Sequence, residues 1–324
     1  MNILDKQFII VGGKGGVGRT SVAAALGTVI ARRGRRTLLA HVRCKQRLDA
    51  LLGVEHIGTD ICPVEDNLWA VNMTPAAAIE EMGMLVLKFR TIYRAVFESR
   101  MVKYFLRAVP ALEEYSMIGK AWFHTTEKVR GQPRFDTVIF DGPATGHLIS
   151  MLRVPQVIVE TVPRGPLSAD AERVYAMMTD PTRTGLWIVT LAEEMPVSEA
   201  IDLDAAAGES LGITRDALVV NMLYPDPLQG DQQLSEPLAA ARAAAHKRGD
   251  DVETVLRSTA TLLERHRINE AYLTKLEQEL PLPQIRLPHL FGSSFERRAV
   301  DTLAERIEAA IAAAEDAGRD GVSL

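Results

Sequence analysis

The chain of 324 residues has little cysteine, no long apolar run and no excess of basic charge. Its two cysteines, Cys44 and Cys62, are too few for a disulfide framework or a four-thiolate metal site. No stretch approaches the roughly 20 apolar residues that cross a bilayer, and the apolar run Phe8–Val11 ends in glycines rather than continuing as a secretory segment. A net charge of −5 argues against a nucleic-acid binder, which usually has a basic surface. We therefore expect a cytoplasmic protein with no nucleic-acid partner.

The sequence also lacks the Pro-, Gly- or Ser-rich linkers that mark domain boundaries, so we expect a single domain over residues 1–324. Short apolar runs alternate with helical patterns, which is typical of an α/β fold with a mostly parallel sheet flanked by helices. The expected strands lie near 7–11, 36–42, 68–72, 137–141, 186–191, 217–221 and 284–287.

Two segments have helical spacing and no convincing strand, so we expect helical insertions, forming a subdomain, at about 76–130 and 230–280. Within the second insertion the pattern predicts helices at 237–247, 252–264 and 268–280. A closing helix is expected from Phe295 to Ala317.

The first insertion is basic and rich in aromatic residues and methionine. Between Gly83 and Arg130 lie nine Lys or Arg and only four Glu. Because thioethers adapt to irregular apolar partners, the segment could be a surface that accepts varied helices. The alternative is a helical layer whose apolar stripe packs on the sheet while its basic residues are solvated. The residues concerned are Phe89, Tyr93, Phe97, Tyr104, Phe105, Tyr115, Trp122 and Phe123, with Met82, Met84, Met101 and Met117.

The most informative motif is a phosphate-binding loop. The stretch from Gly13 to Thr20 reads GKGGVGRT and stands between an apolar strand and an expected helix. In the template G-x-x-x-x-G-K-[S/T], backbone N–H groups cradle phosphates and the hydroxyl holds Mg²⁺. The amino end of the following helix adds unpaired N–H groups and a favourable dipole. Gly13, Gly18 and Thr20 fit the template, and Arg19 stands where it has lysine.

With Arg19 in the loop we expect the chain to bind a nucleotide, whereas hydrolysis of that nucleotide does not follow. Lysine places a compact ammonium between the terminal phosphates, whereas a guanidinium is planar, wider and fork-shaped. Arg19 can hold a nucleotide through its charge. Phosphoryl transfer, however, depends on how the charged group is positioned at the phosphates, and replacing lysine by arginine alters that position.

A second nucleotide motif follows the strand that ends at Asp141, the usual place for an aspartate that binds Mg²⁺ through water. The chain then reads GPATGH from Gly142 to His147. Here it resembles the ArsA-type ATPases, the family of the arsenite-pump ATPase and of the ATPase that targets tail-anchored membrane proteins. Members carry DTAPTGH as their second switch and a variant phosphate loop with an extra lysine, matched by Lys14. Further similarity lies at 189–197 and 218–221, so the resemblance covers essentially the whole chain. The chain resembles a bacterial member of the family.

The resemblance implies a P-loop NTPase that binds ATP or ADP with Mg²⁺ and works as a dimer. It implies that Lys14 reaches across the dimer interface toward the partner's nucleotide, and that Thr145, Gly146 and His147 relay nucleotide state to the helical layer. For His147 a hydrogen-bonded loop position without a catalytic part is the alternative to proton transfer. The implied catalytic residues are Lys14, Arg19 and Asp141. The implied nucleotide-binding residues are Gly13, Gly15, Gly16, Val17, Gly18, Arg19, Thr20, Ser21 and Asn221, with Thr20 and Asp141 at the metal, Ser21 at the inner phosphate and Asn221 at the adenine edge.

Three departures limit what the resemblance implies. Arg19 is the first. The second follows the strand that ends near His41, where the family has an aspartate that orients the attacking water. This chain has no carboxylate there before Asp49, which could substitute only if the loop bends differently. A missing general-base group costs on the order of 10²-fold or more in rate. The third is the absence of paired cysteines, which excludes a zinc-clasped dimer and a soft-ligand arsenite site.

The sequence therefore favours a dimeric ATP-binding subunit, a chaperone or targeting factor, whose nucleotide state gates a helical surface for a hydrophobic client or membrane protein. Its hydrolysis is expected to be weak or to depend on an ArsA-like paralogue, so both a homodimer and a heterodimer stay open. Two alternatives remain, namely an active anion-pump ATPase and a scaffold that does not hydrolyse nucleotide.

Overall fold

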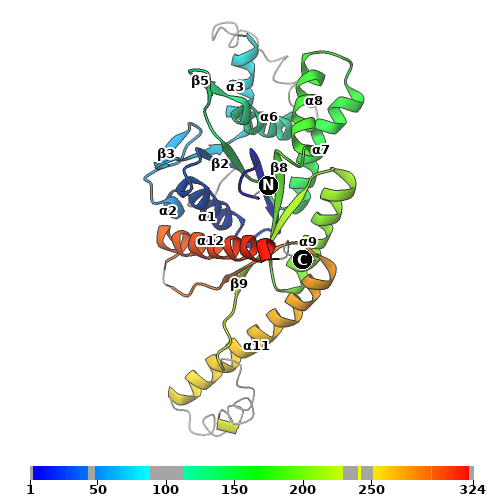
Figure 1. The fold of residues 1–324 in the computed structure, drawn as a ribbon. Coiled ribbons are helices and arrows are strands. Elements are labelled where there is room, and N and C mark those ends of the chain that lie inside the picture. Colours follow the sequence, from blue (N-terminus) through cyan, green and yellow to red (C-terminus); the bar gives the residue numbers. More distant parts are fainter. Residues whose placement is uncertain are drawn as a thin grey trace.

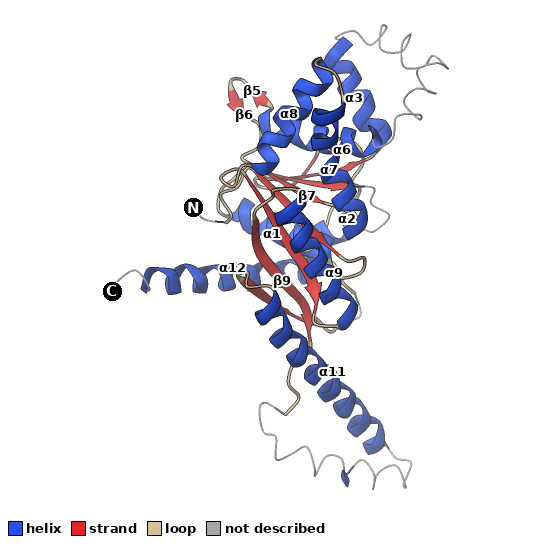
Figure 2. Ribbon diagram, turned by 90° about the vertical axis from the view of Figure 1, so that its right-hand side faces the viewer, coloured by secondary structure: helices blue, strands red, loops and turns tan. Residues whose placement is uncertain are grey.

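The computed structural model describes residues 3–42, 48–87, 112–228, 240–241, 251–292 and 294–320. Its centre is an eight-stranded sheet of order β10-β9-β8-β1-β7-β2-β4-β3 (Figures 1 and 2). Seven strands are parallel and confirm the seven expected from the sequence: β1 Phe8–Gly13, β2 Thr37–Val42, β4 Leu68–Met73, β7 Thr137–Asp141, β8 Thr184–Leu191, β9 Arg215–Leu223 and β10 Gln284–Pro288. The edge strand β3 (Cys62–Glu65), which runs antiparallel to β4, was not expected.

Helices cover both faces of the sheet, which explains why its central strands are apolar along their whole length. Alternate strand residues point to opposite faces. Ile9 and Val11 of β1 join a core with α1 (Arg19–Arg32), α2 (Leu48–Leu52) and α12 (Arg297–Asp320). Phe8 and Ile10 join the core on the other face, with α6 (Leu112–Thr126), α7 (Thr145–Thr161), α8 (Pro166–Thr179) and α9 (Glu194–Ala205). Figure 1 shows α12, the expected closing helix, lying along α1.

The first insertion is helical in α3 (Pro75–Leu87) and α6. The expectation of no strand over 76–130 is wrong at its end, where β5 (Lys128–Val129) pairs with β6 (Gln132–Pro133). Arg130 and Gly131 both have positive φ, 53° and 84°, as a two-residue hairpin turn of the primed type requires. Arg-Gly is a weaker sequence signal for this turn than Asn-Gly.

The described part of the insertion packs as a helical layer. Tyr115, Met117, Ile118 and Ala121 of α6 are all buried in the core. This arrangement agrees with the interpretation in which the apolar stripe packs on the sheet. Phe89, Tyr93, Phe97, Met101, Tyr104 and Phe105, on which the docking interpretation also depends, lie outside the described residues.

The second insertion differs from its expected form. The two helices expected at 252–264 and 268–280 are one continuous helix, α11 (Asp251–Glu279), because the residues that join them include neither glycine nor proline. Most of the helix expected at 237–247 lies outside the described residues. Figures 1 and 2 show α11 extending away from the sheet. A π-helical turn (Ala206–Ser210) follows α9.

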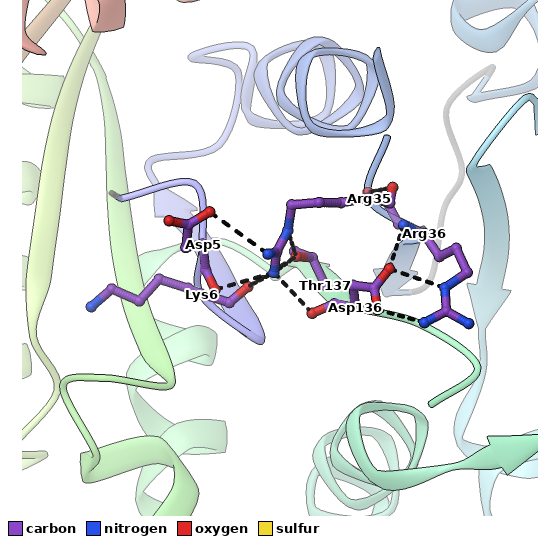
Figure 3. A network of polar contacts seen from close by, with 7 residues as sticks. Asp5, Lys6, Arg35, Arg36, Asp136 and Thr137 are labelled. Carbon is purple, nitrogen blue, oxygen red and sulfur yellow. Dashed lines mark hydrogen bonds and ion pairs between the residues drawn. The ribbon is translucent and has the colours of Figure 1, made fainter. Parts of the chain in front are cut away.

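A polar network closes the amino-terminal edge of the sheet (Figure 3). The Arg36 guanidinium donates to both carboxylate oxygens of Asp136, at 3.0 and 2.6 Å, and these hydrogen bonds hold the pKa of Asp136 below its ordinary value. Arg35 donates to Thr137 Oγ1 at 2.9 Å. Lys6 forms a buried ion pair with Asp216 at 3.3 Å. These contacts join the strand ends opposite the phosphate loop.

No helix among the described residues is both long enough and apolar enough to cross a membrane.

Candidate functional site

The loop between β1 and α1 has the backbone that a phosphate cradle requires. Gly13, Gly16 and Gly18 have positive φ, at 149°, 90° and 87°. A Cβ at Gly13 would lie 2.1 Å from the Val189 carbonyl oxygen, so this glycine is fixed by close packing as well as by its φ. A Cβ at Gly15 or Gly16 would meet nothing within 4 Å, so the loop leaves open space on this side.

The loop leads directly into α1, whose buried residues run from Val22 to Ala31. Thr20 and Ser21 stand in the first turn, which contains no acidic residue. The unpaired N–H groups and the dipole of this helix end favour an anion, and no carboxylate in the turn opposes one. The structure therefore brings Gly15, Gly16, Thr20 and Ser21 together at the amino end of α1.

Arg19 contacts the switch segment, defined here as residues 142–147. Its Nη1 donates to the carbonyl oxygen of Gly142 at 3.1 Å and also to that of Pro143. Burial lowers the pKa of Arg19, although the nearby carboxylates of Asp141 and Glu199 act in the opposite direction. Sequence reasoning placed Arg19 at the phosphates but gave no sign that it would contact the switch segment.

The carboxylate of Asp141 lies beside the phosphate loop, at the carboxyl end of β7, and is 1% exposed. Its Oδ2 accepts a hydrogen bond from His41 Nδ1, at the corresponding end of the neighbouring strand β2. Its Oδ1 is buried with no hydrogen-bond partner among the described residues, and Thr145 Oγ1 is in the same situation. Sequence reasoning missed His41, because the two residues are neighbours only through strand pairing.

The remaining switch residues begin α7. Thr145 is buried in its first turn, whereas Gly146 and His147 are exposed. Residues 43–47, where the resemblance places the first switch, lie outside the described residues. Asp49, considered as a substitute carboxylate, accepts a hydrogen bond from the Ala50 backbone N–H at 2.9 Å in the first turn of α2.

Lys14 and Asn221 make contacts within the chain. Lys14 forms an ion pair with Glu199 of α9, and both side chains are about one-third exposed, at 30%. Asn221 is buried, and its Nδ2 donates to the Val17 carbonyl oxygen at 2.9 Å. The same Nδ2 would lie 2.3 Å from a Cβ at Gly18, so this glycine gives Asn221 access to the loop.

An aromatic group stands at the carboxyl ends of β9 and β10, beyond Asn221. The rings of Tyr224 and His289 are stacked at 4.8 Å, and His289 also lies 4.5 Å from Phe291. Phe291 is 62% exposed. Helix α11 is fixed here by Asn269, whose Oδ1 accepts from the Tyr224 N–H at 2.8 Å. Its Nδ2 donates to the Ala192 carbonyl oxygen at 3.1 Å.

These residues fit a nucleotide and its magnesium ion. The loop leaves space beside Gly15 and Gly16 for phosphate oxygens. The unpartnered Asp141 Oδ1 and Thr145 Oγ1 are oxygens of the kind that bind Mg²⁺, directly or through its water. The parallel sheet and the strand–loop–helix motif define a P-loop NTPase fold.

Comparison with known proteins supports a similarity to one ATPase family. A model of the anion-transporting ATPase family, ArsA, matches residues 6–164. ATPase BagA of Mycobacterium tuberculosis is 28% identical over 244 residues, which cover 72% of this chain and 68% of that protein. A Halobacterium salinarum protein, provisionally named as an arsenical pump-driving ATPase, is 28% identical over 71% of this chain but only 37% of its own length. ATPase GET3 of Lachancea thermotolerans is 23% identical over 61% of this chain and 67% of that protein. The family model, which spans just under half of the chain, and these relatives support an ArsA-type ATPase family.

Proposed function

We propose that this chain is an ATP-binding subunit that acts as a dimer and whose nucleotide state gates a helical surface for a client or membrane partner. The observation that carries the proposal is the phosphate loop in direct hydrogen-bond contact with the switch segment through Arg19. A phosphate group in the cradle would compete with the Gly142 and Pro143 carbonyls for the guanidinium. Nucleotide binding would therefore alter the contacts of the switch segment.

The residues have distinct roles in this proposal. The backbone N–H groups from Gly15 to Arg19 hold the phosphates, with Ser21 at the inner phosphate. Thr20 would hold Mg²⁺, with Asp141 acting through a metal-bound water, and the ion would supply charge neutralisation at the phosphate oxygens. Asn221, fixed to the loop at Val17, stands at the adenine edge.

Weak hydrolysis follows from two features. Arg19 has two carbonyl partners that compete with the phosphates, so it is poorly placed to follow the charge that develops during phosphoryl transfer. The sequence after His41 also offers no carboxylate before Asp49 to orient water, and Asp49 is already engaged by a backbone N–H.

The dimer is proposed from Lys14. Its ion pair with Glu199 is partly exposed and is therefore weak, so Lys14 can leave it at small cost to reach the nucleotide of a partner. The partner is a second copy or an ArsA-like paralogue with complete catalytic motifs. In the second case Lys14 and Arg19 would help to complete the partner's site.

Two helices connect the site to possible client surfaces. α7 begins within the switch segment and packs through Val154 against Tyr115 of α6 and Ala171 of α8. α11 is held by Asn269 at the ends of β8 and β9, close to Asn221. We propose a cytoplasmic protein whose client is an apolar helix or a membrane protein, based on the aromatic and methionine content of residues 76–130.

The test is sedimentation velocity of the purified chain without nucleotide, with ADP and with ATP, combined with phosphate release on the same preparation. The proposal predicts a nucleotide-dependent shift from monomer to dimer, with little phosphate release unless a paralogue is added. Rapid phosphate release by the chain alone would favour an active anion-pump ATPase. If the sedimentation coefficient does not change with nucleotide and no nucleotide binds, the result would favour a scaffold.

A further inference from the structure

We propose that His41 is a positioning residue for Asp141: it occupies one carboxylate oxygen and leaves the other, Oδ1, for the hydration shell or ligands of Mg²⁺. This inference rests on the proposed nucleotide site and goes beyond it, because neither the phosphate loop nor the switch segment contains His41.

The sheet brings the two side chains together. β2 and β7 are neighbouring parallel strands, and His41 and Asp141 are paired in their register. Leu39 and Ile139, two residues earlier in each strand, belong to the core on the α1 face. Because strand side chains alternate with a period of two, His41 and Asp141 lie on that face as well, where α1 begins with Thr20 in its first turn.

Burial makes the contact specific. His41 is 8% exposed and Asp141 is 1% exposed, so bulk water has little access to the contact between them. Nδ1 of His41 bonds Oδ2 of Asp141. An ionised carboxylate can only accept hydrogen bonds, so Nδ1 must carry the proton. This fixes the ring tautomer and the rotation of the carboxylate.

The other carboxylate oxygen of Asp141, Oδ1, is the one left available for a ligand. Oδ1 of Asp141 is buried and has no partner among the described residues. A buried carboxylate oxygen that accepts nothing is costly, so a site for an external donor is implied. A metal-bound water would supply such a donor. His41 thus decides which oxygen points to the metal, in the way that outer-shell partners orient metal ligands.

The test compares three substitutions by calorimetric binding of ADP, once in EDTA and once across a Mg²⁺ titration. His41→Asn keeps an amide donor near the position of Nδ1. His41→Leu removes the donor, and His41→Gln moves it one carbon further away. The exposed residue His56 provides the control variant His56→Asn.

Removal of an outer-shell partner typically weakens metal affinity by about 10- to 100-fold. We expect His41→Leu and His41→Gln to raise the Mg²⁺ concentration for half-saturation by roughly that factor. ADP affinity in EDTA should stay within about twofold of the unsubstituted chain, and His41→Asn and His56→Asn should titrate normally. An Asp141→Asn background should abolish the effect of His41→Leu, because the two changes remove the same interaction.

The inference is overturned if His41→Leu and His41→Gln need no more Mg²⁺ than the unsubstituted chain, or if they lose ADP affinity equally in EDTA. If His41→Leu does not fold, the comparison of His41→Gln with His41→Asn decides, and equal titrations contradict the inference. If the unsubstituted chain binds no ADP in either condition, the proposed nucleotide site itself fails. That outcome is distinct, because it appears before any substitution is made.

Discussion

Replacement of Arg19 by lysine tests how the phosphate loop and the switch segment are coupled. Arg19 donates to the carbonyl oxygens of Gly142 and Pro143. A phosphate that recruits the guanidinium must therefore displace or share these hydrogen bonds. A lysine ammonium is compact and has no fork with which to hold both carbonyls, so it is freer to turn toward the phosphates.

The magnitude follows from the bonds that compete. A hydrogen bond to a charged group contributes about 1.5–3 kcal/mol net. Relief from one such competing bond corresponds to roughly 10- to 100-fold in affinity. We expect Arg19→Lys to bind Mg-ATP at least about tenfold more tightly. We also expect faster hydrogen exchange over residues 142–147 without nucleotide, because the segment has lost its two bonds.

Calorimetry and hydrogen exchange on the same samples measure both effects. Arg32→Lys is the matched control: Arg32 is in the same helix, but it pairs at the surface with Asp301 at 2.7 Å. It should change neither affinity nor exchange over 142–147. Weaker ATP binding by Arg19→Lys, or unchanged exchange over 142–147, would refute the reasoning. Hydrolysis should stay slow in Arg19→Lys, since the first switch still lacks its carboxylate.

Three further predictions concern the loop, acid stability and the far edge of the sheet. Gly15→Ala should change the unfolding free energy by no more than about 0.5 kcal/mol, because the added Cβ meets no atom within 4 Å. The same substitution should weaken ATP binding at least about tenfold. Gly18→Ala should destabilise the fold by more than about 1 kcal/mol, since φ is 87°; urea unfolding that ranks the two variants the other way would contradict this. Burial lowers the pKa of His124 below its ordinary 6.5. The unfolding free energy should therefore fall as the pH drops below about 6.5, because the unfolded chain takes up the proton more readily than the folded chain. In His124→Gln the loss of unfolding free energy between about pH 7.5 and 5.5 should be smaller. Lys6→Met should cost about 3–5 kcal/mol in urea unfolding, because Asp216 is left buried without its cation, and a loss below about 1 kcal/mol would contradict the role of this pair.

Much of the fold could be predicted because its strands are buried on both faces. Continuous apolar runs such as Phe8–Val11 report that burial directly. β3 escaped prediction because Cys62–Glu65 is a half-buried edge strand containing proline, with no alternating pattern. The hairpin at Arg130–Gly131 depends on backbone angles that the residue types only weakly indicate.

The site was predictable only as far as its motifs are local in sequence. The glycines of the loop and Asp141 stand out in the sequence because each comes at the end of an apolar strand. The hydrogen bonds of Arg19 to the switch segment and of His41 to Asp141 join residues 100 or more positions apart in the sequence. Such contacts arise from the strand order β1-β7-β2, which no single motif encodes.

The most direct test of the account is calorimetric binding of ATP and ADP with Mg²⁺ to the purified chain, with phosphate release followed on the same sample. We expect both nucleotides to bind and phosphate release by the chain alone to be slow. Absence of binding, or rapid Mg²⁺-dependent turnover without a partner, would contradict it.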